Sequence, residues 1–221
     1  MKVLAIIPAR KGSKGIIGKN LINFSGKPLI QWSIEAALKS KVITDVVVSS
    51  DGDEILEYAK KNRDILTIKR PKELAEDTSK TAPVLLHVLE ELKHKNYDYL
   101  ILLQPTSPLR TSDDIDTAFH KLIELKANSL ISVCTMDYHP YKAFKINENG
   151  FLQGIINNDF PFSPRQELPQ TVKANGAIYI ISVKEFLLEK TLLTSSTAYF
   201  EMSKEKSLDI DTLDDTLGYN K

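Results

Sequence analysis

Short apolar runs alternate with longer amphipathic stretches over the first 135 residues. The apolar runs are expected strands: residues 3–7, 45–50, 66–68, 99–103 and 129–135. The stretches between them carry apolar residues at helical spacing and are expected helices: residues 28–41, 53–62, 82–95 and 112–126. Strands that are apolar throughout are covered on both faces. The alternation therefore predicts an α/β fold with a doubly wound, mostly parallel sheet.

The pattern changes after residue 135. Residues 139–170 hold several phenylalanines and prolines, and their Asn-Glu-Asn-Gly run predicts a hairpin. This segment is too small for a core of its own, so its aromatic side chains need another surface. The regular pattern then resumes with expected strands at 177–182 and 199–202, a helix at 183–189, a stretch at 208–211 and a final helix. We therefore expect one domain over residues 1–221, with residues 139–170 inserted.

A glycine-rich, basic loop follows the first predicted strand. Glycines let consecutive backbone N–H groups turn toward one point, and nearby cations add positive charge there. Such a loop between a strand and a helix is typical of a phosphate site. Neither the Walker A spacing nor the dinucleotide G-x-G-x-x-G spacing is present. The loop residues concerned are Arg10, Lys11, Gly12, Lys14, Gly15, Gly18 and Lys19.

Charge and cysteine content narrow the possible partners. Lysine plus arginine equals aspartate plus glutamate, at 29 each, so the overall charge favours neither nucleic acid nor a membrane surface. The single cysteine, Cys134, excludes an intrachain disulfide, is expected to be buried, and fits a reducing compartment. The apolar stretch at residues 3–7 is shorter than a signal peptide requires. We expect the protein in the cytoplasm.

Six motifs occur in a recognisable order. They are IPARKGSKGIIGKN at 7–20, RP at 70–71 with LAEDT at 74–78, LQPTSPLR at 103–110, PRQELP at 164–169, NGAIY at 175–179 and DID at 209–211. The chain resembles the CMP-sialic acid synthetases (acylneuraminate cytidylyltransferases), including bacterial CMP-legionaminic acid synthetases. It departs from their usual loop at Lys11 and at Ile17-Gly18. The resemblance implies that CTP activates an acylated nine-carbon sugar acid, N-acetylneuraminate or N,N′-diacetyllegionaminate, giving CMP-sugar and pyrophosphate.

The resemblance also implies a CTP site made of two segments. The triphosphate cradle would be formed by Arg10, Ser13, Lys14, Lys19 and Asn20. The cytosine side would be formed by Arg70, Asp77, Ser79 and Thr81, although the run at 77–79 alone is typical of a helix N-cap. Arg10 and Lys19 are the expected catalytic cations, because they would meet the charge on departing pyrophosphate. Lys11 matches no family position and is expected to be solvated.

The sugar and the metal complete the implied site. The sugar acid would contact Gln104, Lys142, Arg165, Gln166, Asn175 and Tyr179; from its apolar strand alone, Tyr179 could equally be a core aromatic. In an extended chain, Asp209 and Asp211 share one face, and two carboxylates with substrate phosphates suit Mg²⁺. One carboxylate or a metal-bound hydroxide would take the proton from the sugar's hydroxyl, with Asp211 the favoured base.

Other readings stay open at this level. In the family, the inserted segment makes a homodimer and reaches the partner's active site, whereas an unrelated segment could fold back on its own domain. The acceptor could instead be a 3-deoxy-octulosonate or a sugar phosphate. The chain could also be a non-catalytic nucleotide-binding regulator, although such a protein has no need for the two aspartates.

Overall fold

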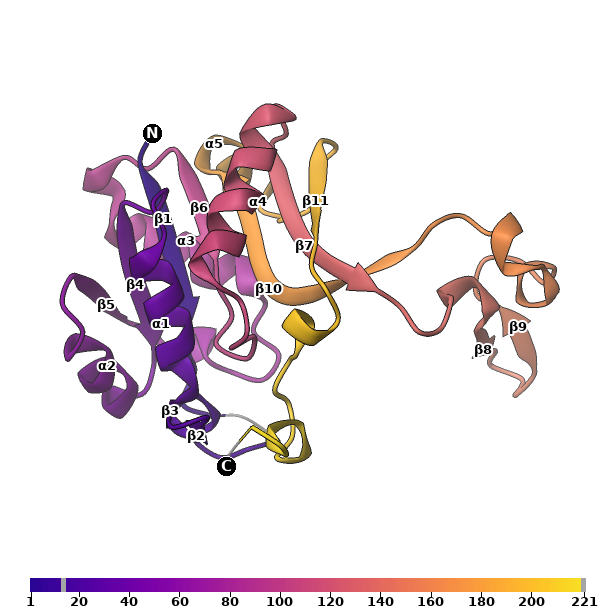
Figure 1. The fold of residues 1–221 in the computed structure, drawn as a ribbon, viewed down its shortest axis with the longest axis horizontal. Helices are drawn as coiled ribbons and strands as arrows, with labels where there is room; N and C mark the ends of the chain where they lie inside the picture. The colour runs from indigo at the N-terminus through magenta and orange to yellow at the C-terminus, as the bar shows by residue number, and fades with distance from the viewer. Residues whose placement is uncertain (13–14, 220–221) are drawn as a thin grey trace.

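A single mixed sheet forms the centre of the molecule. The computed structural model describes residues 1–12 and 15–219, and within them seven strands pair in the order β11-β7-β10-β6-β1-β4-β5 (Figure 1). β10 runs antiparallel to both of its neighbours, and all other pairs are parallel. The strands are β1 (Val3–Pro8), β4 (Asp45–Ser50), β5 (Ile65–Lys69), β6 (Tyr99–Leu102), β7 (Ser129–Thr135), β10 (Val172–Ser182) and β11 (Thr197–Glu201). The mostly parallel sheet is thus confirmed.

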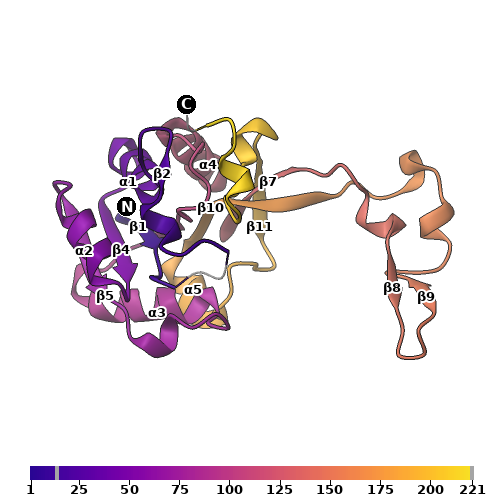
Figure 2. The same cartoon turned by 90° about the horizontal axis from the view of Figure 1, so that it is seen from below.

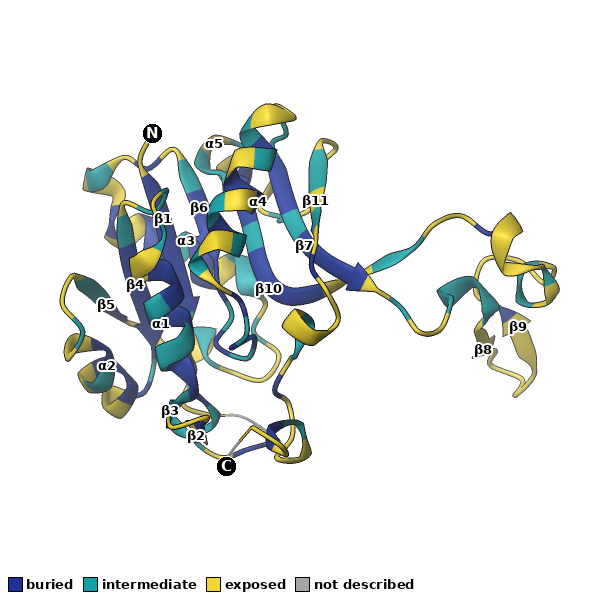
Figure 3. Ribbon diagram, viewed as in Figure 1, coloured by how far each residue is buried: buried dark blue, intermediate teal, exposed yellow. Residues whose placement is uncertain are grey.

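Helices cover both faces of this sheet. Along β1, Ala5 and Ile7 belong to the core cluster that also holds residues of α1, α2 and α4. Leu4 and Ile6 belong to the opposite cluster, with residues of α3 and α5. Figure 3 shows the buried strands between these two layers. The helices are α1 (Leu29–Lys39), α2 (Asp53–Lys60), α3 (Thr81–Glu91), α4 (Ser112–Glu124) and α5 (Val183–Glu189), so the doubly wound arrangement is confirmed.

The segment between β7 and β10 extends away from the sheet. We call residues 136–171 the arm; Figures 1 and 2 show it projecting from the rest of the chain, which we call the body. The predicted hairpin is present as β8 (Phe144–Ile146) and β9 (Leu152–Gly154). The arm does not fold back on the body. A second small hairpin, β2 (Asn23–Phe24) with β3 (Lys27–Pro28), precedes α1.

Two expectations near the C-terminal half need correction. β10 begins at Val172 rather than at residue 177, because it also pairs with the outer end of β7 across an irregularity between Ala174 and Tyr179. The predicted final helix is only a 3₁₀ turn, Asp214–Thr216. The Asp215 carboxylate accepts hydrogen bonds from the backbone N–H groups of residues 211 and 212. The turn ends at Leu217, whose backbone is extended.

Two further observations concern the described residues. Cys134 is buried within β7, as expected. Across residues 1–12 and 15–219, no helix combines the length and the apolar character that crossing a bilayer requires.

Candidate active site

A cavity of about 540 Å³ opens where β1 and β6 end. Ligands of open α/β sheets bind at this edge, because the loops after parallel strands converge there. Nine of the residues implicated by the sequence line the cavity: Arg10, Lys19, Asn20, Arg70, Asp77, Ser79, Thr81, Gln104 and Asp211. Two further predicted cradle residues, Ser13 and Lys14, lie outside the described residues.

Hydrogen bonds and close packing join the basic loop after β1 to the segment 209–211, which contains the two aspartates. Lys19 Nζ donates to the backbone oxygen of Ile210 and to Asp211 Oδ1, both at 2.9 Å, and its side chain is only 13% exposed. Gly15 passes so close that a Cβ there would lie 2.4 Å from the Asp211 carbonyl oxygen. Asn20 is buried and donates to the Arg10 carbonyl at 2.8 Å. The phosphate-binding and acidic segments therefore form one packed unit.

Two arginines line the cavity and have different partners. Arg70 is 5% exposed; its guanidinium donates to the Ser49 carbonyl at 2.7 Å and to Ser49 Oγ at 3.2 Å. Burial lowers the pKa of Arg70 to about 10, which leaves it positive at neutral pH. Arg10 Nη1 lies 2.5 Å from Asp77 Oδ1. A phosphate that binds Arg10 would compete with this carboxylate. By contrast, Lys11 is exposed as expected and reaches Glu54.

Two residues fix the position of Gln104: Gly176, which packs against its side chain, and the buried Arg110, which binds its backbone carbonyl. Gly176 has φ of +78°, and a Cβ at that position would lie 2.8 Å from Gln104 Oε1. Arg110 Nη1 donates to the Ala177 carbonyl at 2.8 Å and to the Gln104 carbonyl at 3.3 Å. The guanidinium is enclosed by protein, so the loop after β6 is held against β10 from behind the cavity.

The two aspartates flank a buried isoleucine. Ile210 is buried and its N–H donates to the Thr106 carbonyl at 2.8 Å, whereas Asp209 and Asp211 lie on the solvent side. The predicted alternation is therefore confirmed. Burial raises the pKa of Asp209, and the negative charges of Asp211 and Asp215 add to that effect.

These carboxylates can be tested for fit to a divalent cation. Within residues 1–12 and 15–219, no three histidine, cysteine, aspartate or glutamate side chains group into a complete metal site. Two neighbouring carboxylates that repel each other suit a hard cation whose remaining ligands are phosphate oxygens and water. The donor set of Asp209 and Asp211 thus fits Mg²⁺ bound together with a nucleotide.

The other residues implicated in sugar binding lie apart from the cavity lining. Asn175 is buried, accepts from Ser132 Oγ at 2.6 Å and donates to Ser207 Oγ at 2.8 Å. Tyr179 is partly buried against the core, and burial raises its pKa. The remaining three, Lys142, Arg165 and Gln166, belong to the arm. Within one chain, the structure does not bring these three to the cavity.

Some residues of the site escaped the sequence reasoning. Thr106 and Lys80 line the cavity but were assigned no role in the site from the sequence. Thr106 had a usable signal, since it closes the Gln-Pro-Thr run directly after a buried strand. Lys80 had only its position beside the predicted cytosine segment.

Comparisons with known proteins agree with this geometry. The family model described as cytidylyltransferase matches residues 4–150. A pseudaminic acid cytidylyltransferase of Campylobacter jejuni is 36% identical over 97% of this chain and 93% of its own length. A CMP-N,N′-diacetyllegionaminic acid synthase of Legionella pneumophila is 32% identical over 96% of this chain and 92% of its own. An N-acylneuraminate cytidylyltransferase of Streptococcus agalactiae is 35% identical over 97% of this chain, which spans only 52% of that protein.

A solved structure shows the same fold at low sequence identity. It is a CMP:2-keto-3-deoxy-manno-octonic acid synthetase in complex with CTP, 19% identical to this chain, with a TM-score of 0.69 over 96% of this chain and 94% of the other. At this identity the likeness concerns the fold alone. The family model and the full-length relatives go further: the chain belongs to the cytidylyltransferase family of nucleotidyltransferases.

Proposed function

We propose that this enzyme transfers CMP from CTP to the anomeric hydroxyl of an acylated nine-carbon 2-keto sugar acid and releases pyrophosphate. The observation that carries the proposal is the cavity beyond β1 and β6, which gathers cations, a glutamine amide and a carboxylate around one volume. Cations suit a triphosphate, and the amide suits a polyhydroxylated acceptor. A CTP-consuming enzyme with one buried cysteine fits the cytoplasm, which we propose as its compartment.

The reaction forms one P–O bond and breaks another. The acceptor hydroxyl oxygen attacks the α-phosphorus of CTP, and the bond between that phosphorus and the β-phosphate oxygen breaks. Lys19 and Arg10 line the cavity and would meet the negative charge that collects on departing pyrophosphate. Each cation now pairs with a carboxylate, so the triphosphate would exchange these ion pairs for its own.

The acid pair supplies the remaining functions. Asp211 lines the cavity and is the proposed acceptor of the hydroxyl proton. Mg²⁺ bound by Asp209 and Asp211 would offset the charge of the phosphates. Gln104 would orient the sugar acid, and the buried Arg70 would donate to an acceptor atom of cytosine.

The arm is proposed to complete the site of a second copy in a homodimer. Its apolar side chains are exposed in one chain: Phe144, Ile146, Phe151, Leu152, Ile155, Ile156 and Phe162. Monomeric proteins rarely leave such a patch open. A second copy that covers it would bring Lys142, Arg165 and Gln166 toward a cavity that they do not line within their own chain. This proposal also fits their chemistry, because a cationic fork and an ammonium suit a sugar carboxylate.

Acceptor identity is tested by pyrophosphate release with CTP and Mg²⁺. The acceptors to compare are N-acetylneuraminate, N,N′-diacetyllegionaminate, pseudaminate and 3-deoxy-octulosonate; the third enters because of the Campylobacter relative. We expect release with at least one nine-carbon acid and none with the eight-carbon acid. Release with the octulosonate alone would overturn the proposed acceptor class. Binding of CTP without release in any arm would favour a regulator.

A further inference from the structure

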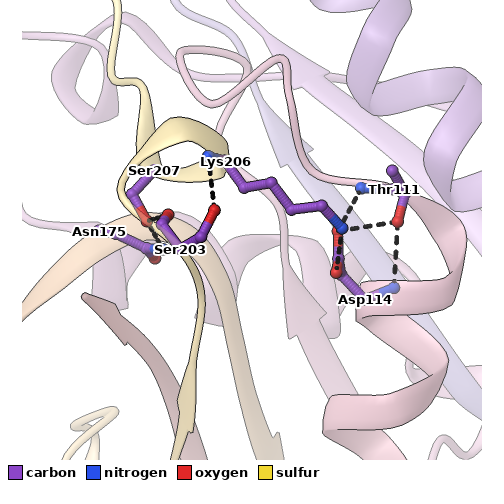
Figure 4. Close-up of polar contacts among 6 residues, drawn as sticks. All are labelled: Thr111, Asp114, Asn175, Ser203, Lys206 and Ser207. Atoms are coloured by element: carbon purple, nitrogen blue, oxygen red, sulfur yellow. Dashed lines mark hydrogen bonds and ion pairs between the residues drawn. The ribbon is translucent and has the colours of Figure 1, made fainter. Parts of the chain in front are cut away.

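A short turn connects the edge strand β11 to the acid pair. Residues 203–207, which we call the anchor turn, leave the strand at Met202 and end two residues before Asp209. The turn is closed on itself, because Ser207 Oγ donates to the Ser203 carbonyl at 2.7 Å. Figure 4 shows it between α4 on one side and β10 on the other. The anchor turn lies outside the cavity lining, so the proposed chemistry assigns it no role.

On the α4 side, an ion pair ties the anchor turn to the helix N-terminus. Lys206 Nζ donates to both carboxylate oxygens of Asp114, at 2.8 and 3.0 Å (Figure 4). The Asp114 side chain is only 12% exposed and also accepts from Thr111 N, which completes the capping box of α4. Its position is therefore fixed by the helix, and Lys206 is attached to a rigid point.

On the β10 side, an amide ties the anchor turn to the sheet. Asn175 Nδ2 donates to Ser207 Oγ at 2.8 Å, and Asn175 Oδ1 accepts from Ser132 Oγ and from Ala177 N. The amide is buried and uses its bonds to join β7, β10 and the anchor turn. Gly176 follows it directly, and a Cβ there would lie 3.9 Å from Asp209 Oδ2. Two consecutive residues of β10, Asn175 and Gly176, therefore contact the anchor turn and lie next to the Asp209 carboxylate, respectively.

Downstream, the acid pair is held at its centre. Ile210 is buried and bound to the Thr106 carbonyl. Asp209 therefore lies between two fixed points, Ser207 and Ile210. The Asp209 carboxylate also accepts a hydrogen bond from the Thr106 side chain, so release of the first point would free the backbone on the Ser207 side while this contact and Ile210 remain.

We propose that Lys206, Asp114 and Asn175 are positioning residues that hold Asp209 in register with Asp211 for a divalent cation. The inference rests on the proposed function, in which the acid pair binds Mg²⁺ with CTP. The ion pair acts through the anchor turn and touches neither substrate nor metal. Loss of a contact that orients a metal-binding group weakens metal affinity by about tenfold or more.

The test measures Mn²⁺ binding by electron paramagnetic resonance, with CTP present and no acceptor sugar. Lys206→Met and Asp114→Asn are each expected to raise the dissociation constant of Mn²⁺ about tenfold. The asparagine retains an oxygen for the helix cap. The matched control is Lys204→Met, which removes an exposed ion pair from the same anchor turn to Asp137 and is expected to change nothing. Lys206→Arg should bind Mn²⁺ like the unmodified protein.

A double-mutant cycle separates positioning from a general loss of stability. The Lys206→Met and Asp114→Asn changes together should cost no more Mn²⁺ affinity than either alone, since both break one contact. In steady state, half-maximal activity should need about tenfold more Mg²⁺, with kcat at saturating Mg²⁺ nearly unchanged. Equal Mn²⁺ affinity in all variants would overturn the inference, as would equal losses in Lys206→Met, Lys206→Arg and Lys204→Met.

The controls also separate this inference from the proposed function. An unmodified protein that binds Mn²⁺ with CTP but releases no pyrophosphate with any acceptor contradicts the proposed function alone. An unmodified protein that releases pyrophosphate without binding Mn²⁺ overturns the positioning inference and the metal role of the acid pair, and leaves the proposed transfer of CMP standing.

Discussion

The body and the arm differ in the solvent exposure of their large apolar side chains. Phe186, on α5, is fully buried between the helix and the sheet, whereas Phe162 in the arm is 80% exposed. The body also supplies partners for its charges, as between Lys19 and Asp211, whereas Lys142 and Arg165 of the arm lie outside the lining of the cavity beyond β1 and β6 in their own chain. The body can therefore fold on its own contacts. The arm leaves large apolar side chains exposed within one chain, and the proposed second copy is what would bring its residues into use.

The largest expected effect distinguishes the two phenylalanines. Phe186→Ala should lower the free energy of unfolding by about 3–5 kcal/mol, because it leaves a cavity in a packed core. Phe162→Ala should leave the unfolding of the body nearly unchanged and instead weaken self-association. Urea unfolding at several protein concentrations measures both. A loss of similar size for the two variants at low concentration would show that the arm has a core of its own.

Substitution of Lys19, whose ammonium lines the cavity, tests the catalytic role of the body. Lys19→Met should lower kcat about 100- to 1,000-fold, because the charge on departing pyrophosphate loses a close partner. The melting temperature should fall modestly, because the two hydrogen bonds of the ammonium are lost. Pyrophosphate release and thermal unfolding report the two quantities. Lys11→Met is the matched control, since Lys11 is exposed and its ammonium pairs with Glu54; equal losses in both would contradict the assigned role of Lys19.

A mixing experiment tests whether the arm serves a second copy. Lys142→Ala and Lys19→Met should each be nearly inactive alone. When they are mixed in equal amounts, about half of the dimers are hybrids with one intact site, which restores about a quarter of the unmodified activity. No recovery after subunit exchange, which size-exclusion chromatography with light scattering would verify, would show that the arm acts within its own chain or not at all.

The smallest effect concerns acid stability of the body. Burial by itself raises the pKa of Asp45, but the hydrogen bond from Tyr97 and the charge of Lys95 outweigh it and leave the pKa below its usual value. The resulting stabilisation is present above the pKa of an unfolded aspartate, about 3.9, and is lost as pH falls through the lower folded value. Asp45→Asn should therefore reduce the slope of unfolding free energy with pH below about pH 4. An unchanged slope would contradict this.

Most strands and helices of the body could be predicted from the sequence, because the patterns that indicate them lie within short segments. Apolar runs and helical periodicity placed β4, β7 and α5 at their observed bounds. The end of the chain escaped this reasoning: the 3₁₀ turn at Asp214–Thr216 stops at Leu217, whose backbone is extended, and no periodicity of apolar residues marks that stop.

The site likewise has residues that local sequence patterns predict and contacts that they do not. The glycine-rich loop and the strand ends mark the cavity from within short segments, so Arg10, Lys19 and Gln104 could be anticipated. The pair of Lys206 with Asp114 joins residues 92 positions apart and leaves no local pattern. The direction in which the arm extends could not be predicted either. Its phenylalanines indicate that a covering surface is needed, but not where that surface lies.

The ladder between β7 and β10 has one further consequence. Thr135 and Val172 are direct partners in it, so the chain leaves the sheet and returns to it through a single rung. An insertion with adjoining ends can lengthen, shorten or change composition without shifting the register of any strand beyond that rung. The arm can thus change during evolution without disturbing the sheet that carries the cavity beyond β1 and β6.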